Sequence, residues 1–127
     1  MRNTFKKVEK LKSRNLISEL FTSGKSLSAY PLKLIYLEKE HDSSSMVQAG
    51  VSVPKRIFKK AVDRNRIKRL MREAYRLNKY LIYESEHTKK HIFMFIYVGK
   101  QEENFALIEK KMKKLLHTFL NTVNDNL

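Results

Sequence analysis

The feature that most constrains the fold is the run of seven apolar residues IFMFIYV at positions 92–98, in a chain of which 31% is charged. A strand that is apolar at every position needs cover on both faces, so this run is expected in the middle of a sheet. The run is far shorter than the roughly 20 residues needed to cross a bilayer. We therefore expect a central strand over 92–98 and no membrane partner.

Three further segments show helical spacing of their apolar residues. The first follows Ser13, a candidate N-cap, and ends near Gly24, a candidate C-cap. The second spans 67–81 and is strongly basic, and the third spans 105–119 with one apolar face. These segments predict a short first helix and two longer ones.

The remaining apolar runs predict strands. Residues 32–37 and 46–53 flank a polar loop over 38–45 and are expected to pair antiparallel as a hairpin, with an extra short strand near 26–30. The resulting order is αβββαβα. This order predicts α+β architecture, a two-layer sandwich of a small, mainly antiparallel sheet with helices, in a single domain over residues 1–127.

Composition narrows the environment and the chemistry. The chain has no cysteine, which fits a reducing compartment and excludes a thiolate metal site, and its charged N-terminus lacks the apolar segment of a signal peptide. We therefore expect a cytoplasmic protein. His87 and His91 are four residues apart, but no third ligand accompanies them, so no metal site is predicted.

Positive charge is concentrated in one part of the sequence. The chain carries a net charge of +14, and residues 54–80 hold eleven Lys or Arg against two acids. Arg64, Lys68, Arg72 and Arg76 recur every four residues and, with Arg69, are expected on the exposed side of the basic helix. Like charges at this spacing cost about 0.2–0.5 kcal/mol per pair, so a polyanion is favoured over a merely solvated face.

Guanidinium groups suit bidentate binding of phosphate. If five or six phosphates are contacted, affinity should fall steeply with salt. A strand-loop-strand segment before the basic helix matches neither a helix-turn-helix nor a basic-zipper protein, so RNA is favoured over DNA.

The central motif carries a resemblance to a known family. SVPKR at 52–56, followed by KAVDRNRIKRLMREAYR at 60–76, resembles the signature of the bacterial ribonuclease P protein subunit. The first helix ending in LFTSGKS at 20–26, the apolar strand and the closing amphipathic helix also come in the order typical of that family. The resemblance covers nearly the whole chain, and its specific part is the Arg-Asn-Arg motif at 64–66.

The resemblance implies a function in tRNA processing. The family subunit joins a large catalytic RNA that removes the 5′ leader of precursor tRNA, and its fold has a left-handed βαβ crossover. Catalysis belongs to the RNA and its Mg²⁺ ions, so the enzyme is the assembled endonuclease, and the protein alone is expected to be inactive and to have no small-molecule substrate. The implied RNA-facing residues are Arg64, Asn65, Arg66, Lys68, Arg69 and Arg72, with Lys55 and Arg56 in the loop beside them.

The family also holds the leader in a cleft between the first helix and the sheet. Two aromatic residues usually occur there one turn apart, and this chain has Phe21 at the second position but Ile17 at the first. Tyr36 on the first long strand is the other implied cleft residue. Phe21 has an equally weighted alternative as a core residue.

Two other functions remain as alternatives. A generic or ribosomal RNA-binding protein without a role in tRNA cleavage would share the charge and the fold type. A stand-alone nuclease would require paired carboxylates, yet Asp63 and Glu73 lie ten residues apart on one helix, about 15 Å by helical rise. No nucleophile is paired with a base, so no catalytic residue is predicted.

Overall fold

The computed structural model describes residues 4–85 and 89–124. Four strands form one sheet in the order β1-β2-β4-β3, with β1 at Lys25–Ala29, β2 at Leu32–Glu38, β3 at Val47–Ser52 and β4 at His91–Tyr97. The β1/β2 and β2/β4 pairs are antiparallel, and the β3/β4 pair is parallel. The mainly antiparallel sheet, the short strand β1 and the central position of the apolar strand are thus confirmed.

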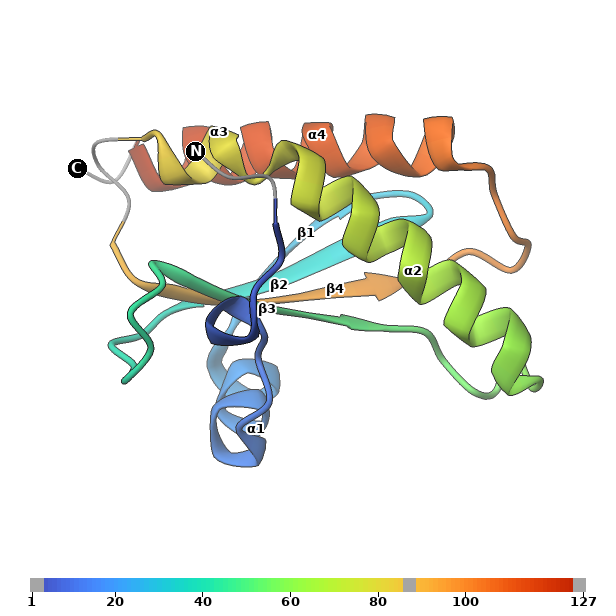
Figure 1. Ribbon diagram of the computed structural model, residues 1–127, viewed down its shortest axis with the longest axis horizontal. Helices are drawn as coiled ribbons and strands as arrows, with labels where there is room; N and C mark the ends of the chain where they lie inside the picture. The colour runs from blue at the N-terminus through green and yellow to red at the C-terminus, as the bar shows by residue number, and fades with distance from the viewer. Residues whose placement is uncertain (1–3, 86–88, 125–127) are drawn as a thin grey trace.

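The helices cover the two faces of this sheet unequally (Figure 1). Helices α2 (Ala61–Asn78), α3 (Tyr80–Tyr83) and α4 (Phe105–Asn124) lie on one face, and α1 (Arg14–Ser23) lies on the other. A single 3-10 turn, η1 (Lys7–Glu9), precedes α1. The predicted α+β sandwich is confirmed, with α1 as partial cover on the second face.

The alternation of side chains along β4 divides the core into two parts. Phe93 and Phe95 face the α2/α4 layer, where Phe93 contacts Phe119 of α4 with ring centroids 4.8 Å apart. Ile92 and Met94 face the other side and pack with Leu11, Leu20 and other residues around α1. Because successive side chains of a strand point to opposite faces, a continuous apolar run is required where both faces are covered.

The predicted hairpin of β2 with β3 is wrong. These strands do not pair, because β4 lies between them and Phe93 is opposite Tyr36 on one side and Ala49 on the other. The loop after β2 crosses the position of β4, so that β3 lies two strand positions away from β2 in the sheet. The most apolar strand, β4, lies between β2 and β3, where both neighbours supply hydrogen bonds and both of its faces are buried. The local patterns of β2 and β3 do not reveal that a third strand separates them.

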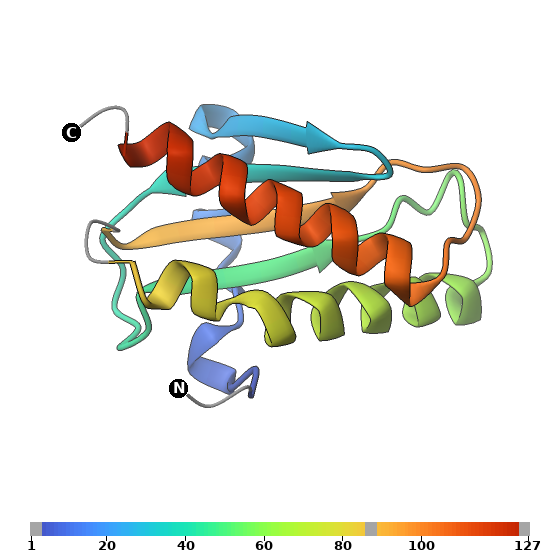
Figure 2. The same ribbon diagram turned by 90° about the horizontal axis from the view of Figure 1, so that it is seen from above.

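The connection from β3 through α2 to β4 is a crossover between parallel neighbours. Figure 2 views the sheet with the helix layer toward the reader; when β3 and β4 point upward, β4 lies to the left of β3. The crossover is therefore left-handed, against the strong general preference for right-handed βαβ units. This matches the implication of the resemblance and places α2 beside β3, at the edge of the sheet.

Local signals at the helix ends agree with the sequence. The Ser13 hydroxyl accepts a hydrogen bond from the backbone N–H of Leu16 at 3.3 Å, which confirms the predicted N-cap of α1. Gly24 is the C-cap, and a Cβ there would lie 2.4 Å from the carbonyl oxygen of Leu20, so the close turn into β1 requires glycine. Among the helices of the described residues, none has the length and apolarity to cross a membrane.

Candidate nucleic-acid interface

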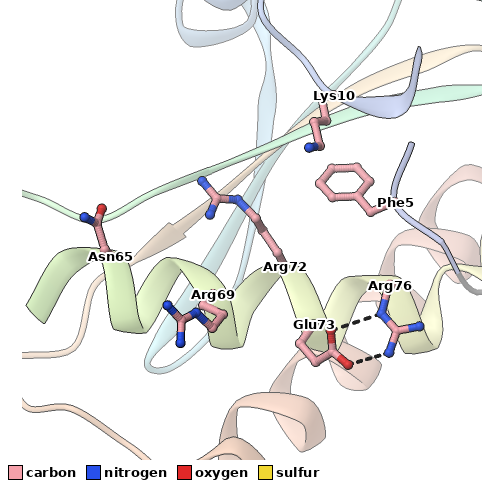
Figure 3. A pocket seen from close by; sticks show the side chains of 7 residues that line it. All are labelled: Phe5, Lys10, Asn65, Arg69, Arg72, Glu73 and Arg76. Atoms are coloured by element: carbon pink, nitrogen blue, oxygen red, sulfur yellow. Dashed lines mark hydrogen bonds and ion pairs between the residues drawn. The ribbon is translucent and has the colours of Figure 1, made fainter. Parts of the chain in front are cut away.

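An open groove follows the exposed side of α2, where the N-terminal segment crosses near the helix (Figure 3). Its volume is about 520 Å³. Four cationic side chains, an amide, a carboxylate and one aromatic ring line it: Lys10, Arg69, Arg72, Arg76, Asn65, Glu73 and Phe5. This composition favours an anionic ligand.

Helical geometry decides which basic residues meet in the groove. Each residue turns about 100° around the axis, so a four-residue step drifts by about 40°, and Arg64 and Arg76 point about 120° apart. The same geometry brings Asn65, Arg69, Arg72 and Arg76 within about 60° of one another. The predicted ladder of every fourth residue is therefore not one row, and the set that includes Asn65 and Arg69 forms the groove instead.

Arg64 stabilises the loop that precedes α2. Its guanidinium donates hydrogen bonds to the carbonyl oxygens of Phe58 at 2.8 Å and Lys59 at 2.9 Å. Lys55 and Arg56 are exposed in this loop, but neither lines the groove. The structure thus gives Arg64 an internal role and leaves the two loop cations accessible at the same end of the helix.

Arg66 is engaged by acids. It donates to both carboxylate oxygens of Glu102 at 2.7 and 2.9 Å and to Asp63 at 2.8 Å. The hydrogen bonds with Glu102 raise the pKa of Arg66, and those with Arg66 lower the pKa of Glu102. Arg66 therefore joins the start of α2 to the loop before α4, and two of its three guanidinium nitrogens are engaged by acids.

Arg69 and Arg72 are the open guanidinium groups of the site. Both are exposed, and within residues 4–85 and 89–124 neither makes a salt bridge or a hydrogen bond. Arg76, by contrast, forms an ion pair with Glu73, and its hydrogen bond to Glu73 is the main cause that lowers the pKa of that carboxyl. Lys68 is half-buried at the border of this face. The prediction of one cationic row along α2 is therefore wrong, because on this helix Arg69 and Arg72 are open whereas Arg64 and Arg76 are engaged by other groups.

A second groove of about 320 Å³ opens on the α1 side of the sheet. Ile17 of α1 lines it together with Gly50 of β3 and Met94 of β4. Phe21 lies one turn further along α1, is 52% exposed, and does not line this groove. The core alternative for Phe21 is wrong, since half of its side chain is in contact with solvent.

The predicted placement of Tyr36 in a cleft beside α1 is wrong. Tyr36 is 6% exposed and points to the opposite face of the sheet, where its ring centroid lies 5.1 Å from that of Phe119 in α4. Its neighbours Ile35 and Leu37 pack on the α1 side. Since side chains alternate along a strand, a shift of one residue in the alignment moves a side chain from the α1 side of the sheet to the core on the other face.

Two residues that line both grooves were not predicted as site residues from the sequence. Phe5 and Lys10 come from the N-terminal segment and line both grooves, and Arg72 is the third residue that the grooves share. No local pattern marks Phe5 or Lys10 in the sequence, because they meet α2 only through tertiary contacts.

The described residues offer no catalytic metal centre. Among them, no group of three or more His, Cys, Asp or Glu side chains is arranged to hold a metal ion. His87 lies outside the described residues, and His91 is buried with its ring centroid 5.0 Å from that of Phe119. Burial lowers the pKa of His91. This small α+β domain with an open cationic groove has the features of a nucleic-acid-binding protein.

Comparison with known proteins specifies this class. The family model for ribonuclease P matches residues 5–120. The ribonuclease P protein component of Porphyromonas gingivalis is 42% identical over 115 residues, which cover 87% of this chain and 82% of the relative. The corresponding protein of Chlorobium phaeobacteroides is 36% identical over 127 residues, covering 91% and 87%. The chain therefore belongs to the ribonuclease P protein family.

A solved structure supports the same assignment. The RNase P protein from Thermotoga maritima superimposes with a TM-score of 0.69 at 25% identity, covering 87% of this chain and 96% of that one. The Staphylococcus aureus RNase P protein superimposes with a TM-score of 0.68 at 19% identity, covering 87% and 94%, and this likeness concerns the fold alone.

Proposed function

We propose that this chain is the protein subunit of a ribonuclease P ribonucleoprotein. In this role it binds a large catalytic RNA and the 5′ leader of precursor tRNA, and it assists the endonucleolytic cut that gives the mature 5′ end. Family membership supports the role, and the cytoplasm is the proposed location of the particle.

The observation that carries the proposal is the pair of open guanidinium groups on α2. Arg69 and Arg72 face solvent beside the amide of Asn65, in a groove with further cations. Two planar groups with ten N–H donors between them can grip successive phosphates in bidentate fashion, as a folded RNA backbone would require. Arg64 and Arg66 then act mainly by fixing the start of α2, through the bonds described above.

The α1 side of the sheet is the proposed path of the leader. Ile17 lines the second groove and Phe21 exposes its ring one turn away. Exposed apolar and aromatic side chains suit the binding of unpaired bases, because the faces of unpaired bases are free to stack on them. In a double helix the bases stack on one another instead. Tyr36 takes no part in this proposal, because it is buried on the other face.

Chemistry is assigned to the RNA partner. The family resemblance implies Mg²⁺, which would stabilise the attacking and leaving oxygens of the phosphodiester. The described residues do not fit such an ion, since no cluster of three or more ligating side chains occurs among them. Mg²⁺ therefore has no proposed ligand on this chain, and the protein contributes charge and position.

One experiment separates this role from its two rivals. Purified protein is mixed with labelled precursor tRNA at low salt, with and without the large RNA of ribonuclease P, and cleavage at the mature 5′ end is followed. We expect no cleavage by protein alone and stimulation when the large RNA is present. Cleavage by protein alone would favour a nuclease, and the lack of stimulation would favour a generic RNA-binding protein.

A further inference from the structure

The N-terminal segment is attached to the body of the protein through buried polar contacts. We call residues 4–11 the N-terminal strap. Nζ of Lys79, at the end of α2, lies 2.5 Å from Oε1 of Glu9, and these side chains are 3% and 8% exposed. Lys79 also donates to the carbonyl of Thr4, and the backbone N–H of Leu11 donates to Ala49 of β3 at 3.0 Å. The strap is thus held at both ends.

The position of the strap places Phe5 where the two grooves meet. Phe5, Lys10 and Arg72 line both the groove on α2 and the groove on the α1 side of the sheet. The Phe5 ring is half-buried and contacts Tyr75 through an edge-to-face arrangement with centroids 5.6 Å apart. The Lys10 ammonium lies 5.7 Å from the centroid of the same ring. Figure 3 shows the Arg72 side chain leaving α2 on the side of the strap, with its guanidinium turned away from the Phe5 ring.

A merely structural role explains only part of this arrangement. Packing on Tyr75 accounts for the buried part of Phe5, but a purely apolar contact has no need of the two cations, Lys10 and Arg72, that line the same grooves. An aromatic ring that lines a solvent-open groove together with a lysine and an arginine is a combination suited to a nucleotide of unpaired RNA. The base stacks on the ring while the cations neutralise the adjoining phosphates.

We propose that Phe5 and Lys10 of the N-terminal strap, together with Arg72 of α2, form a nucleotide-binding position at the junction of the two grooves. Phe5 stacks an unpaired base, and Lys10 and Arg72 bind the flanking phosphates. A single RNA strand then passes from the exposed face of α2 to the α1 side of the sheet. The inference rests on the proposed function only in taking RNA as the ligand.

The test uses the full chain and a fluorescein-labelled single-stranded oligoribonucleotide of ten residues, with a hairpin RNA of the same length as the paired counterpart. Phe5→Leu keeps an apolar side chain against Tyr75 and removes the ring. We expect it to weaken single-strand binding at least about fivefold, the lower end of the range for one stacked base, and to leave the salt dependence unchanged. Hairpin binding should change less than twofold.

Lys10→Ala should have a different signature. It removes one phosphate contact, so the slope of log Kd against log salt should decrease by about 0.7. Tyr30→Leu and Lys113→Ala are matched controls, since both residues are exposed and line neither groove, and they should leave affinity within twofold. A strap that had simply detached would instead alter affinity and slope together in both variants.

A second substitution at Phe5 separates the loss of base stacking from a general loss of folding. Phe5→Trp retains an aromatic face and should bind the single strand at least as well as the wild-type protein. The inference is overturned if Phe5→Leu stays within twofold of wild type, if Phe5→Trp loses as much affinity as Phe5→Leu, or if the wild-type chain does not bind the oligonucleotide. Failure of precursor-tRNA cleavage with an intact Phe5 effect would overturn the proposed function alone.

Discussion

The sharpest prediction compares two arginines of α2 that lie six positions apart, Arg66 and Arg72. Arg66 already donates to Glu102 and Asp63, whereas Arg69 and Arg72 have no such partner among the described residues. Arg66→Gln and Arg72→Gln therefore remove the same formal charge from one helix with different consequences. Only Arg72→Gln removes a guanidinium that is available to phosphate.

The structure sets the expected magnitude. Three open groove cations, Lys10, Arg69 and Arg72, predict a slope of about −2 for log K of single-stranded RNA binding against log salt, at about 0.7 for each phosphate. All eleven cations of 54–80 would instead give about −8. Arg72→Gln should lower the steepness by about 0.7. The ratio of affinities at 50 and 200 mM salt then shrinks about threefold.

Fluorescence anisotropy of a labelled oligoribonucleotide at five or six salt concentrations measures these slopes. Arg66→Gln should leave the slope within error of wild type, because its charge is already balanced by Glu102 and Asp63. Equal slopes for Arg66→Gln and Arg72→Gln, or a wild-type slope near −8, would refute the reasoning from ion pairing. Circular dichroism of each variant checks that α2 remains folded.

Three further predictions concern stability and use urea denaturation. Lys79→Met or Glu9→Leu alone should cost about 3–5 kcal/mol by orphaning a buried charge, and the double variant should lose less than the sum; strict additivity would argue against the pair. Tyr36→Ala should cost about 3–5 kcal/mol by opening a cavity beside Phe119, while RNA affinity of the folded variant stays unchanged; a selective loss of affinity would restore Tyr36 to the binding site. Burial lowers the pKa of His91, so the unfolded chain binds the proton more readily, and stability should fall as the pH decreases from about 6.5 toward the lower folded-state pKa. His91→Gln should flatten this part of the stability profile, and an unchanged profile would exclude His91 as its source.

Much of the fold could be read from local patterns. The predicted strand over 92–98 agrees with β4 at His91–Tyr97 to within one residue at each end. The agreement is close because the hydrophobic pattern of a segment directly reflects its burial. The apolar face of α4 was likewise visible, and Ile108, Met112 and Phe119 are all fully buried. Where the pattern had two solutions, as for the partner of β2, the local choice of a hairpin was wrong.

The candidate site was predicted less completely than the fold. The sequence placed it on α2 and identified Asn65, Arg69 and Arg72, which do line the groove. A four-residue spacing drifts around the helix, so the predicted grouping of Arg64 with Arg72 is wrong, and the Arg64 guanidinium binds loop carbonyls instead. The cleft position that the resemblance implies for Tyr36 is wrong because side chains alternate along β2, which turns Tyr36 toward Phe119 on the opposite face.

By itself the sequence determined the class of fold, the central strand, and the helix that carries the excess positive charge, because burial and charge leave periodic traces within one segment. Only the tertiary structure decided which cations remain open, since the acids that neutralise Arg66 include one 36 residues away along the chain. It also decided that the N-terminal strap joins the site, through contacts between Glu9 and Lys79 that are 70 residues apart. Contacts between residues so far apart in the sequence depend on how the intervening helices and strands are arranged, and no local sequence pattern contains that information.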